Sequence, residues 1–181
     1  MAGESLSFIE ALCGTNGPAH DRADKMMLYG QFVGAWDGTV IVHRANGERF
    51  ESSCEVHFGW VLEGRAIQDV WIVPSRTGRS PGEPDRMYGT TLRIYNPRQD
   101  HWQIIFADPV RQAYNQMTGR QVGPDIVQEY RDAAGVICQW CFTEIEDNSL
   151  HWIGRESTDE RKTWRLVDEF YLKRRSRPSG R

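Results

Sequence analysis

Acidic side chains recur beside large apolar residues in segments that have the composition of β-strands. Glu144 lies two residues after Phe142, and Asp168 lies two residues before Phe170. Side chains two positions apart in a strand point to the same face, so both carboxylates are expected among apolar neighbours. Burial there raises the pKa of a carboxyl group towards the range that suits general acid and base catalysis.

Arginine side chains could stabilise the charges that such chemistry develops. Asp69 lies two residues before Trp71, and Arg93 lies two residues before Tyr95. If both face inward, they form an Arg/Asp cluster ringed by aromatic side chains. For each residue alone, a satisfied ion pair or a solvated outer face is the competing interpretation. The candidate catalytic residues are Asp69, Arg93, Glu144, Arg155, Glu156 and Asp168.

The strand expected at 150–158 turns either Arg155 or Glu156 inward, depending on the turns that flank it. A two-residue turn before the strand and a four-residue turn after it would place Arg155 inside, between two acids. Three-residue turns at both places would place Glu156 and Trp152 inside instead. The high free energy of unpaired buried charges favours Arg155, whereas the apolar character of Trp152 favours the second register.

Seven tryptophans are many for a chain of 181 residues. The alternation of side chains along the expected strands turns most of these rings to one face, where they would line an interior space. A wall of this kind is typical of a site for a small apolar or aromatic molecule. The predicted ligand-binding residues are Trp36, Trp60, Trp71, Tyr88, Trp102, Phe106, Trp140, Phe142 and Trp164.

Ten short runs rich in Val, Ile, Thr and aromatic residues position these side chains, and turn signals such as Asn46-Gly47 separate them. Strands are expected at 35–44, 48–62, 65–74, 87–96, 101–108, 114–122, 125–132, 136–146, 150–158 and 163–174. Ten strands with hairpin-length links close into an up-and-down antiparallel barrel, which has no exposed edge. The expected fold class is therefore mostly β, a single lipocalin-like barrel with one short helix at 21–33, capped by Asp21.

The chain length suits one domain. We expect a flexible segment at 1–20, the barrel at 21–175 and a basic tail at 176–181. The segment 75–86 should be a mobile loop and 108–116 a turn of helix, both at a barrel rim where they could gate a ligand. A ketosteroid-isomerase-like cone is the alternative fold, but it needs more helix than 21–33 provides.

Composition makes several functions poor candidates. A net charge of −3 without a basic stripe argues against nucleic acid, and no apolar run is long enough to span a bilayer. Residues 1–17 do not resemble a secretory signal, so a cytoplasmic location is expected. The pair Cys138 and Cys141 would point to opposite faces of a strand, so we expect free thiols and no metal. Neither a G-x-S-x-G nor an H-E-x-x-H motif indicates a hydrolase.

Several motifs resemble those of an uncharacterised bacterial family of lipocalin-like, calycin-type barrels related to nitrobindin. The likeness covers about residues 25–175 and is carried by the G-x-W-x-G motif at Gly34–Gly38, by Trp60–Asp69, Tyr88–Tyr95 and Trp152–Ser157, and by Thr163-Trp164. The resemblance implies the barrel fold. It does not imply one function, because such barrels act as transporters, haem binders, cyclases or isomerases, and the family has no catalytic residues to carry over.

The sequence supports three functions. The first is binding of a small, largely apolar or aromatic ligand in the lumen, without a cofactor. The second is a cofactor-free isomerase, cyclase or lyase that uses the lumen carboxylates and arginines. The third is haem binding, which requires a histidine inside, and His151 turns inward only in the Arg155 register. Exposed aromatic residues such as Tyr171 would allow a homodimer.

Overall fold

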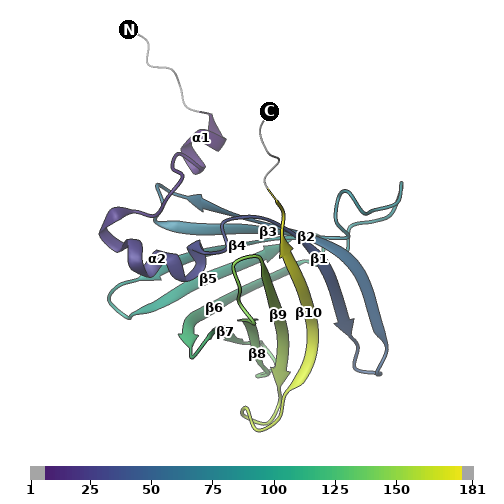
Figure 1. Cartoon of the computed structure of the whole chain (residues 1–181). Coiled ribbons are helices and arrows are strands. Elements are labelled where there is room, and N and C mark those ends of the chain that lie inside the picture. The colour runs from purple at the N-terminus through teal and green to yellow at the C-terminus, as the bar shows by residue number, and fades with distance from the viewer. Residues whose placement is uncertain (1–6, 177–181) are drawn as a thin grey trace.

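The alternating apolar and polar residues form ten strands in a computed structural model, which describes residues 7–176 (Figure 1). Nine of the ten expected strands agree with the observed ones within about two residues at each end, and only the expected 136–146 ends three residues too late. The strands are β1 (Gly34–His43), β2 (Arg49–Val61), β3 (Ala66–Val73), β4 (Met87–Asn96), β5 (His101–Asp108), β6 (Ala113–Val122), β7 (Asp125–Arg131), β8 (Ile137–Thr143), β9 (Ser149–Ser157) and β10 (Arg165–Arg174). The segment 109–112 is a turn that leads directly into β6, so the helical turn expected at 108–116 is wrong.

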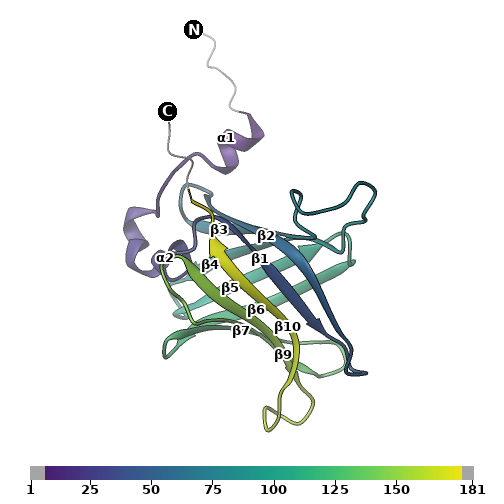
Figure 2. The same cartoon turned by 45° about the vertical axis from the view of Figure 1, so that its right-hand side comes forward.

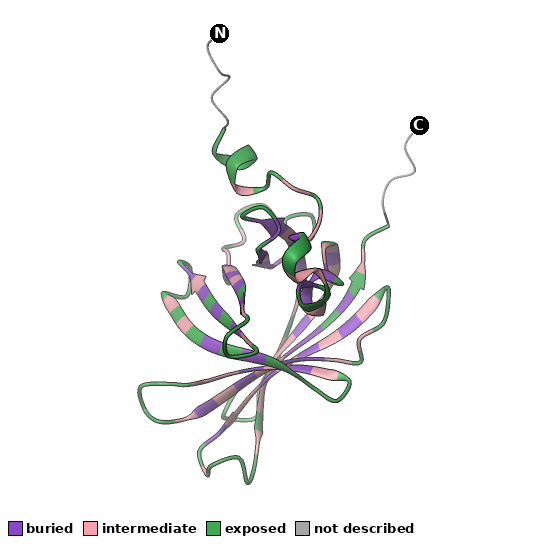
Figure 3. Ribbon diagram, turned by 90° about the vertical axis from the view of Figure 1, so that its left-hand side faces the viewer, coloured by how far each residue is buried: buried purple, intermediate pink, exposed green. Residues whose placement is uncertain are grey.

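Each strand pairs antiparallel with its neighbours in the sequence, and β1 pairs with β10 to close the barrel (Figures 1 and 2). Gly38, for example, faces Cys54 of β2 on one side and Leu172 of β10 on the other. The predicted fold class is confirmed, and the cone with an open sheet is excluded. Buried positions alternate with exposed ones along the strands (Figure 3). The buried apolar residues of the strands form one cluster inside the barrel, so the lumen is the core.

Three short helices precede the strands: α1 (Phe8–Leu12), a 3-10 helix (His20–Arg22) and α2 (Ala23–Gly30). α2 covers one end of the barrel and buries Met26 and Tyr29, and Phe32 follows it into the lumen. Asp21 does not cap α2, because it lies in the 3-10 helix and pairs with Arg22 and Arg65. No helix within residues 7–176 is both long and apolar enough to cross a membrane.

The segment before α2 contacts the turn between β2 and β3. The Leu62 amide donates to the Leu12 carbonyl at 2.9 Å, and the Ala19 amide donates to the Gly64 carbonyl at 3.0 Å. Gly64 has φ +71°, and a Cβ there would lie 2.2 Å from the Gly17 carbonyl oxygen. The flexibility expected for 1–20 stays a prediction, and residues 1–6 and the end of the basic tail, 177–181, lie outside the described residues.

The G-x-W-x-G motif has a clear structural reason at the covered end. Gly34 has φ +131°, a backbone conformation that favours glycine. A Cβ on Gly38 would lie 2.0 Å from the carbonyl oxygen of Tyr171, so only glycine fits there. Between them, the buried Trp36 donates its indole N–H to the Phe32 carbonyl at 2.8 Å. The motif therefore fixes the junction between α2 and β1.

Candidate ligand-binding site

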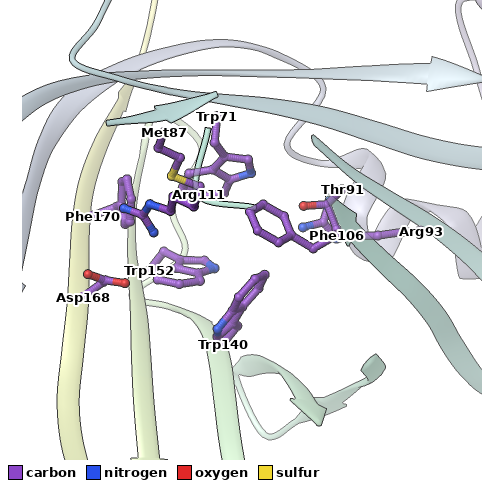
Figure 4. A pocket seen from close by; sticks show the side chains of 10 residues that line it. All are labelled: Trp71, Met87, Thr91, Arg93, Phe106, Arg111, Trp140, Trp152, Asp168 and Phe170. Carbon is purple, nitrogen blue, oxygen red and sulfur yellow. The ribbon is translucent and has the colours of Figure 1, made fainter. Parts of the chain in front are cut away.

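A small cavity of about 40 Å³ lies in the half of the lumen away from α2 (Figure 4). Five aromatic rings and one thioether supply most of its wall. The lining residues are Trp71, Met87, Thr91, Arg93, Phe106, Arg111, Trp140, Trp152, Asp168 and Phe170. The strands β3, β4, β5, β8, β9 and β10 and the turn 109–112 position these side chains. A concave, mostly apolar space with a few polar groups is the usual form of a small-molecule site.

The rings of this wall are in edge-on or tilted contact with one another. The centroid of Trp152 lies 5.6 Å from that of Trp71, 5.7 Å from that of Trp140 and 5.3 Å from that of Phe170. Phe106 packs edge-on against Trp140 at 4.9 Å. Such contacts fix the rings and leave their faces and edges available to a planar guest.

A second, open pocket of about 190 Å³ continues the cavity towards the rim that carries the turn 109–112. The two spaces share four residues, Phe106, Arg111, Trp140 and Asp168. The connection between β3 and β4 (residues 74–86) and that between β5 and β6 (residues 109–112) both lie at this rim, as expected for the segments 75–86 and 108–116. The rim is therefore the side from which the cavity can be reached.

Asp69 and Arg93 meet inside the barrel, where both are almost fully buried. Arg93 donates through Nη1 to Oδ2 of Asp69 and through Nε to Oε1 of Gln128 at 2.9 Å. The second carboxylate oxygen of Asp69 accepts from the Thr91 amide at 2.9 Å. The guanidinium also lies 4.9 Å from the ring centroid of Tyr29. This is a satisfied ion pair at the base of the cavity, and its part in any chemistry stays a prediction.

Asp168 points from β10 towards the cavity, on the opposite side from Arg93 (Figure 4). No group within residues 7–176 donates a hydrogen bond to its carboxylate, and it forms no ion pair there. Burial raises the pKa of Asp168, and the charges of Arg111, His43 and Arg165 only partly oppose this rise. An acceptor group that lacks a partner in an aromatic cavity is suited to receive one from a ligand.

The unpartnered carboxylate should destabilise the ligand-free protein at neutral pH. A carboxyl with a raised pKa in the folded state binds its proton more tightly there than in the unfolded chain, so stability falls as pH rises above the usual value of 3.8. We therefore expect Asp168→Asn to have a higher Tm than wild type at pH 7. Scanning calorimetry should show this difference shrinking as the pH is lowered towards 3.8. A lower Tm for Asp168→Asn at pH 7 would contradict this account.

The register of β9 places Glu156, and not Arg155, on the inner face. Trp152 faces Phe142 and Gly154 faces Trp140, so the even-numbered residues of β9 point inward. Arg155 borders the open pocket, but its guanidinium donates to Gln139 Oε1 at 2.7 Å on the outer face. The favoured Arg155 register is therefore wrong. The inward placement of Trp152 and Glu156 agrees with the alternative, although the connections 144–148 and 158–164 are both longer than the three-residue turns that it assumed.

A β-bulge at Val167 explains why turn length alone misplaced these residues. Arg155 does face Leu166, as the first register requires, but the pairing then shifts so that Gly154 faces Asp168. The extra residue reverses the alternation within β10. Trp164 therefore lies outside, where the Arg155 guanidinium is 4.6 Å from its ring centroid, and its predicted place in the lumen is wrong.

Two further candidate residues lie outside the lumen. Glu144 follows the last residue of β8 with φ +48°, so the alternation no longer applies, and its side chain is 75% exposed. Tyr88 is 39% exposed because β4 turns its odd-numbered neighbours Met87 and Gly89 inward. The inward placement expected for Glu144 and Tyr88 is wrong.

The other predicted aromatic residues divide between the two halves of the lumen. Trp71, Phe106 and Trp140 line the cavity. Those in the covered half pack around α2 and Phe32. They are Trp36, Trp60, Trp102 and Phe142, and none of them lines the cavity. They form the packed core under α2.

Five cavity residues were not among the predicted site residues: Met87, Thr91, Arg111, Trp152 and Phe170. The alternation along the expected strands already turns Phe170 inward, and the alternative to the Arg155 register turns Trp152 inward. Arg111 carries no such signal, because parity is undefined in a turn. None of the histidines within residues 7–176 lines the cavity or the open pocket, so a lumen histidine for haem is not available.

The molecule is a closed, ten-strand antiparallel barrel with a lipocalin-like fold and an aromatic cavity. Two solved structures have similar folds. Rv2717c from M. tuberculosis superposes with a TM-score of 0.59 at 12% sequence identity, over 88% of this chain and 99% of that one. The S-type phycobiliprotein lyase CPES from Guillardia theta superposes with a TM-score of 0.56 at 11% identity, over 84% of this chain and 93% of that one. No protein-family model and no curated protein matches the sequence.

Proposed function

We propose that this protein binds a small, largely apolar or aromatic molecule in the half of the lumen opposite α2. The observation that carries the proposal is the small cavity lined by five aromatic rings, which continues into a wider pocket at the rim. Burial of a planar apolar molecule against these rings supplies the driving force. The few polar groups, Asp168, Arg111, Thr91 and Arg93, orient it.

The sizes of the two spaces indicate how the ligand fits. The small cavity of about 40 Å³ has room for water, whereas the adjoining pocket is about 190 Å³. Arg111 lines both spaces, and its long side chain is 38% exposed at the turn. A ligand that displaces this side chain joins the two spaces, and rotation of an exposed arginine requires no change in the barrel.

Titration with a neutral fluorescent probe, N-phenyl-1-naphthylamine, tests the proposal. We expect the probe's emission to rise on binding to wild type and its affinity to fall at least about tenfold in Trp152→Ala, which removes the central ring of the wall. Trp164→Ala removes an indole from the outer face and serves as the matched control, with an affinity within about twofold of wild type. Circular dichroism verifies that both variants are folded. No binding to wild type, or equal losses in both variants, would reject the proposal.

A second function, acid/base catalysis by a cofactor-free isomerase, cyclase or lyase, is supported by the raised pKa of Asp168 beside Arg111. The name of one similar structure, a phycobiliprotein lyase, is consistent with it. The other candidates contribute less, since Asp69 and Arg93 neutralise each other and Glu156 pairs with Arg165. Turnover of a conjugated ketone by wild type but not by Asp168→Asn would favour catalysis over binding alone. The cytoplasmic location and the homodimer stay predictions.

A further inference from the structure

Three charged residues line the cavity, and two of them, Arg93 and Arg111, have hydrogen-bond partners elsewhere. Arg111 is near enough to Asp168 to lower its pKa, but it makes no hydrogen bond or ion pair with it. Arg93 is paired with Asp69. Nε of Arg111 lies 3.8 Å from Oδ2 of Asp108 and donates a hydrogen bond to the Arg86 carbonyl at 3.1 Å.

Farther out, at the open pocket, Glu156 pairs with Arg165 at 2.8 Å, and the Arg155 guanidinium is held on the outer face by Gln139. Among the described residues that line the small cavity, Asp168 is thus the one charged group without a hydrogen-bonded or ion-paired partner.

The rings around Asp168 favour positive charge in the same space. An aromatic ring carries negative potential over its face, so a cation near several rings is stabilised, and this effect grows when water is excluded. Trp71, Trp152 and Phe170 contact one another at centroid distances of 4.9 to 5.6 Å, and all three line the cavity with Asp168. The same rings oppose an anion. A carboxylate among electron-rich rings is therefore a site for a cation with an apolar surface.

We propose that the ligand is an organic cation, a quaternary or protonated amine on an apolar or aromatic body, whose charged group lies between Asp168 and the rings of Trp71, Trp152 and Phe170. This inference rests on the proposed function, because it names the chemical class of the lumen ligand. The apolar body extends into the open pocket, which Phe106 and Trp140 share with the cavity. Arg111, the neighbouring cation of the protein itself, moves aside when the ligand enters.

Two probes of nearly the same shape test the role of charge. Phenyltrimethylammonium and tert-butylbenzene differ in that a positively charged nitrogen replaces a carbon. Titration followed by the indole N–H signals in ¹H–¹⁵N NMR spectra gives the affinity of each probe. We expect the cation to bind wild type at least about tenfold more tightly than tert-butylbenzene. In Asp168→Asn the affinity for the cation should fall at least about tenfold. The affinity of this variant for tert-butylbenzene should stay within about twofold of the wild-type value.

Glu51→Gln is the matched control, because it also removes one acidic charge, from an exposed position on the outer face of β2. Its affinity for the cation should stay within about twofold of wild type. If tert-butylbenzene binds as tightly as the cation, or if Asp168→Asn retains full affinity for the cation, the inference is overturned and the proposed function stands. If neither probe binds and N-phenyl-1-naphthylamine also fails to bind, both are overturned.

Discussion

Asp69→Ala should lower the free energy of unfolding by about 3–5 kcal/mol. The substitution leaves the guanidinium of Arg93, which is 1% exposed, without its counter-charge in the middle of the lumen. It also removes the acceptor of the Thr91 amide. The remaining partner, Oε1 of Gln128, is neutral and cannot balance the charge. Urea denaturation followed by tryptophan fluorescence measures the loss.

Glu160→Ala provides the comparison, since it removes one partner of an exposed ion pair with Arg131. Its effect should be about 0–1 kcal/mol, because solvent screens this pair. The double variant Asp69→Leu with Arg93→Met replaces both charges by apolar groups and should recover most of the stability lost in Asp69→Ala. A loss in Asp69→Ala no larger than that in Glu160→Ala would show that Arg93 is not held by this pair.

The second large effect is expected at the covered end, where Phe32→Ala should lower the free energy of unfolding by about 3–5 kcal/mol. Phe32 is 1% exposed and stacks on Phe142 at 4.8 Å, with Phe58 at 5.6 Å. Truncation leaves a void that the rigid barrel cannot close. Chemical denaturation measures the change.

Phe8→Ala is the control for this variant, because Phe8 on α1 is 77% exposed and should change stability by less than about 0.5 kcal/mol. Since Phe32 does not line the cavity, Phe32→Ala should also retain the affinity for N-phenyl-1-naphthylamine. Equal stability of Phe32→Ala and Phe8→Ala would contradict the packing described for the covered end.

The barrel could be predicted because its signals are local and repeated. Alternation of side chains identifies strands, short turns identify hairpins, and ten hairpin-linked strands have few ways to avoid free edges. β5 illustrates this, since Trp102, Ile104 and Phe106 are buried and Gln103 and Ile105 are exposed. The helix α1 was not predicted, although Ser7 and Glu10 form a capping box at its start, which is a local sequence signal.

The site could be predicted only where the alternation is unbroken. Trp71, Phe106 and Trp140 lie within regular strands and line the cavity as expected. The bulge at Val167 reverses the alternation by one residue, and nothing in the composition of that segment distinguishes an extra residue from a longer turn. Arg111 reaches the cavity from a turn, where spacing does not specify direction.

Helix α2 covers one end of the barrel, and this limits the route by which a ligand can enter and leave the lumen. Phe32 and Phe142 fill that end, so the proposed ligand would have to enter and leave at the opposite rim, past Arg111. A ligand longer than the lumen would then have one end buried among the rings and its other end exposed to solvent at that rim.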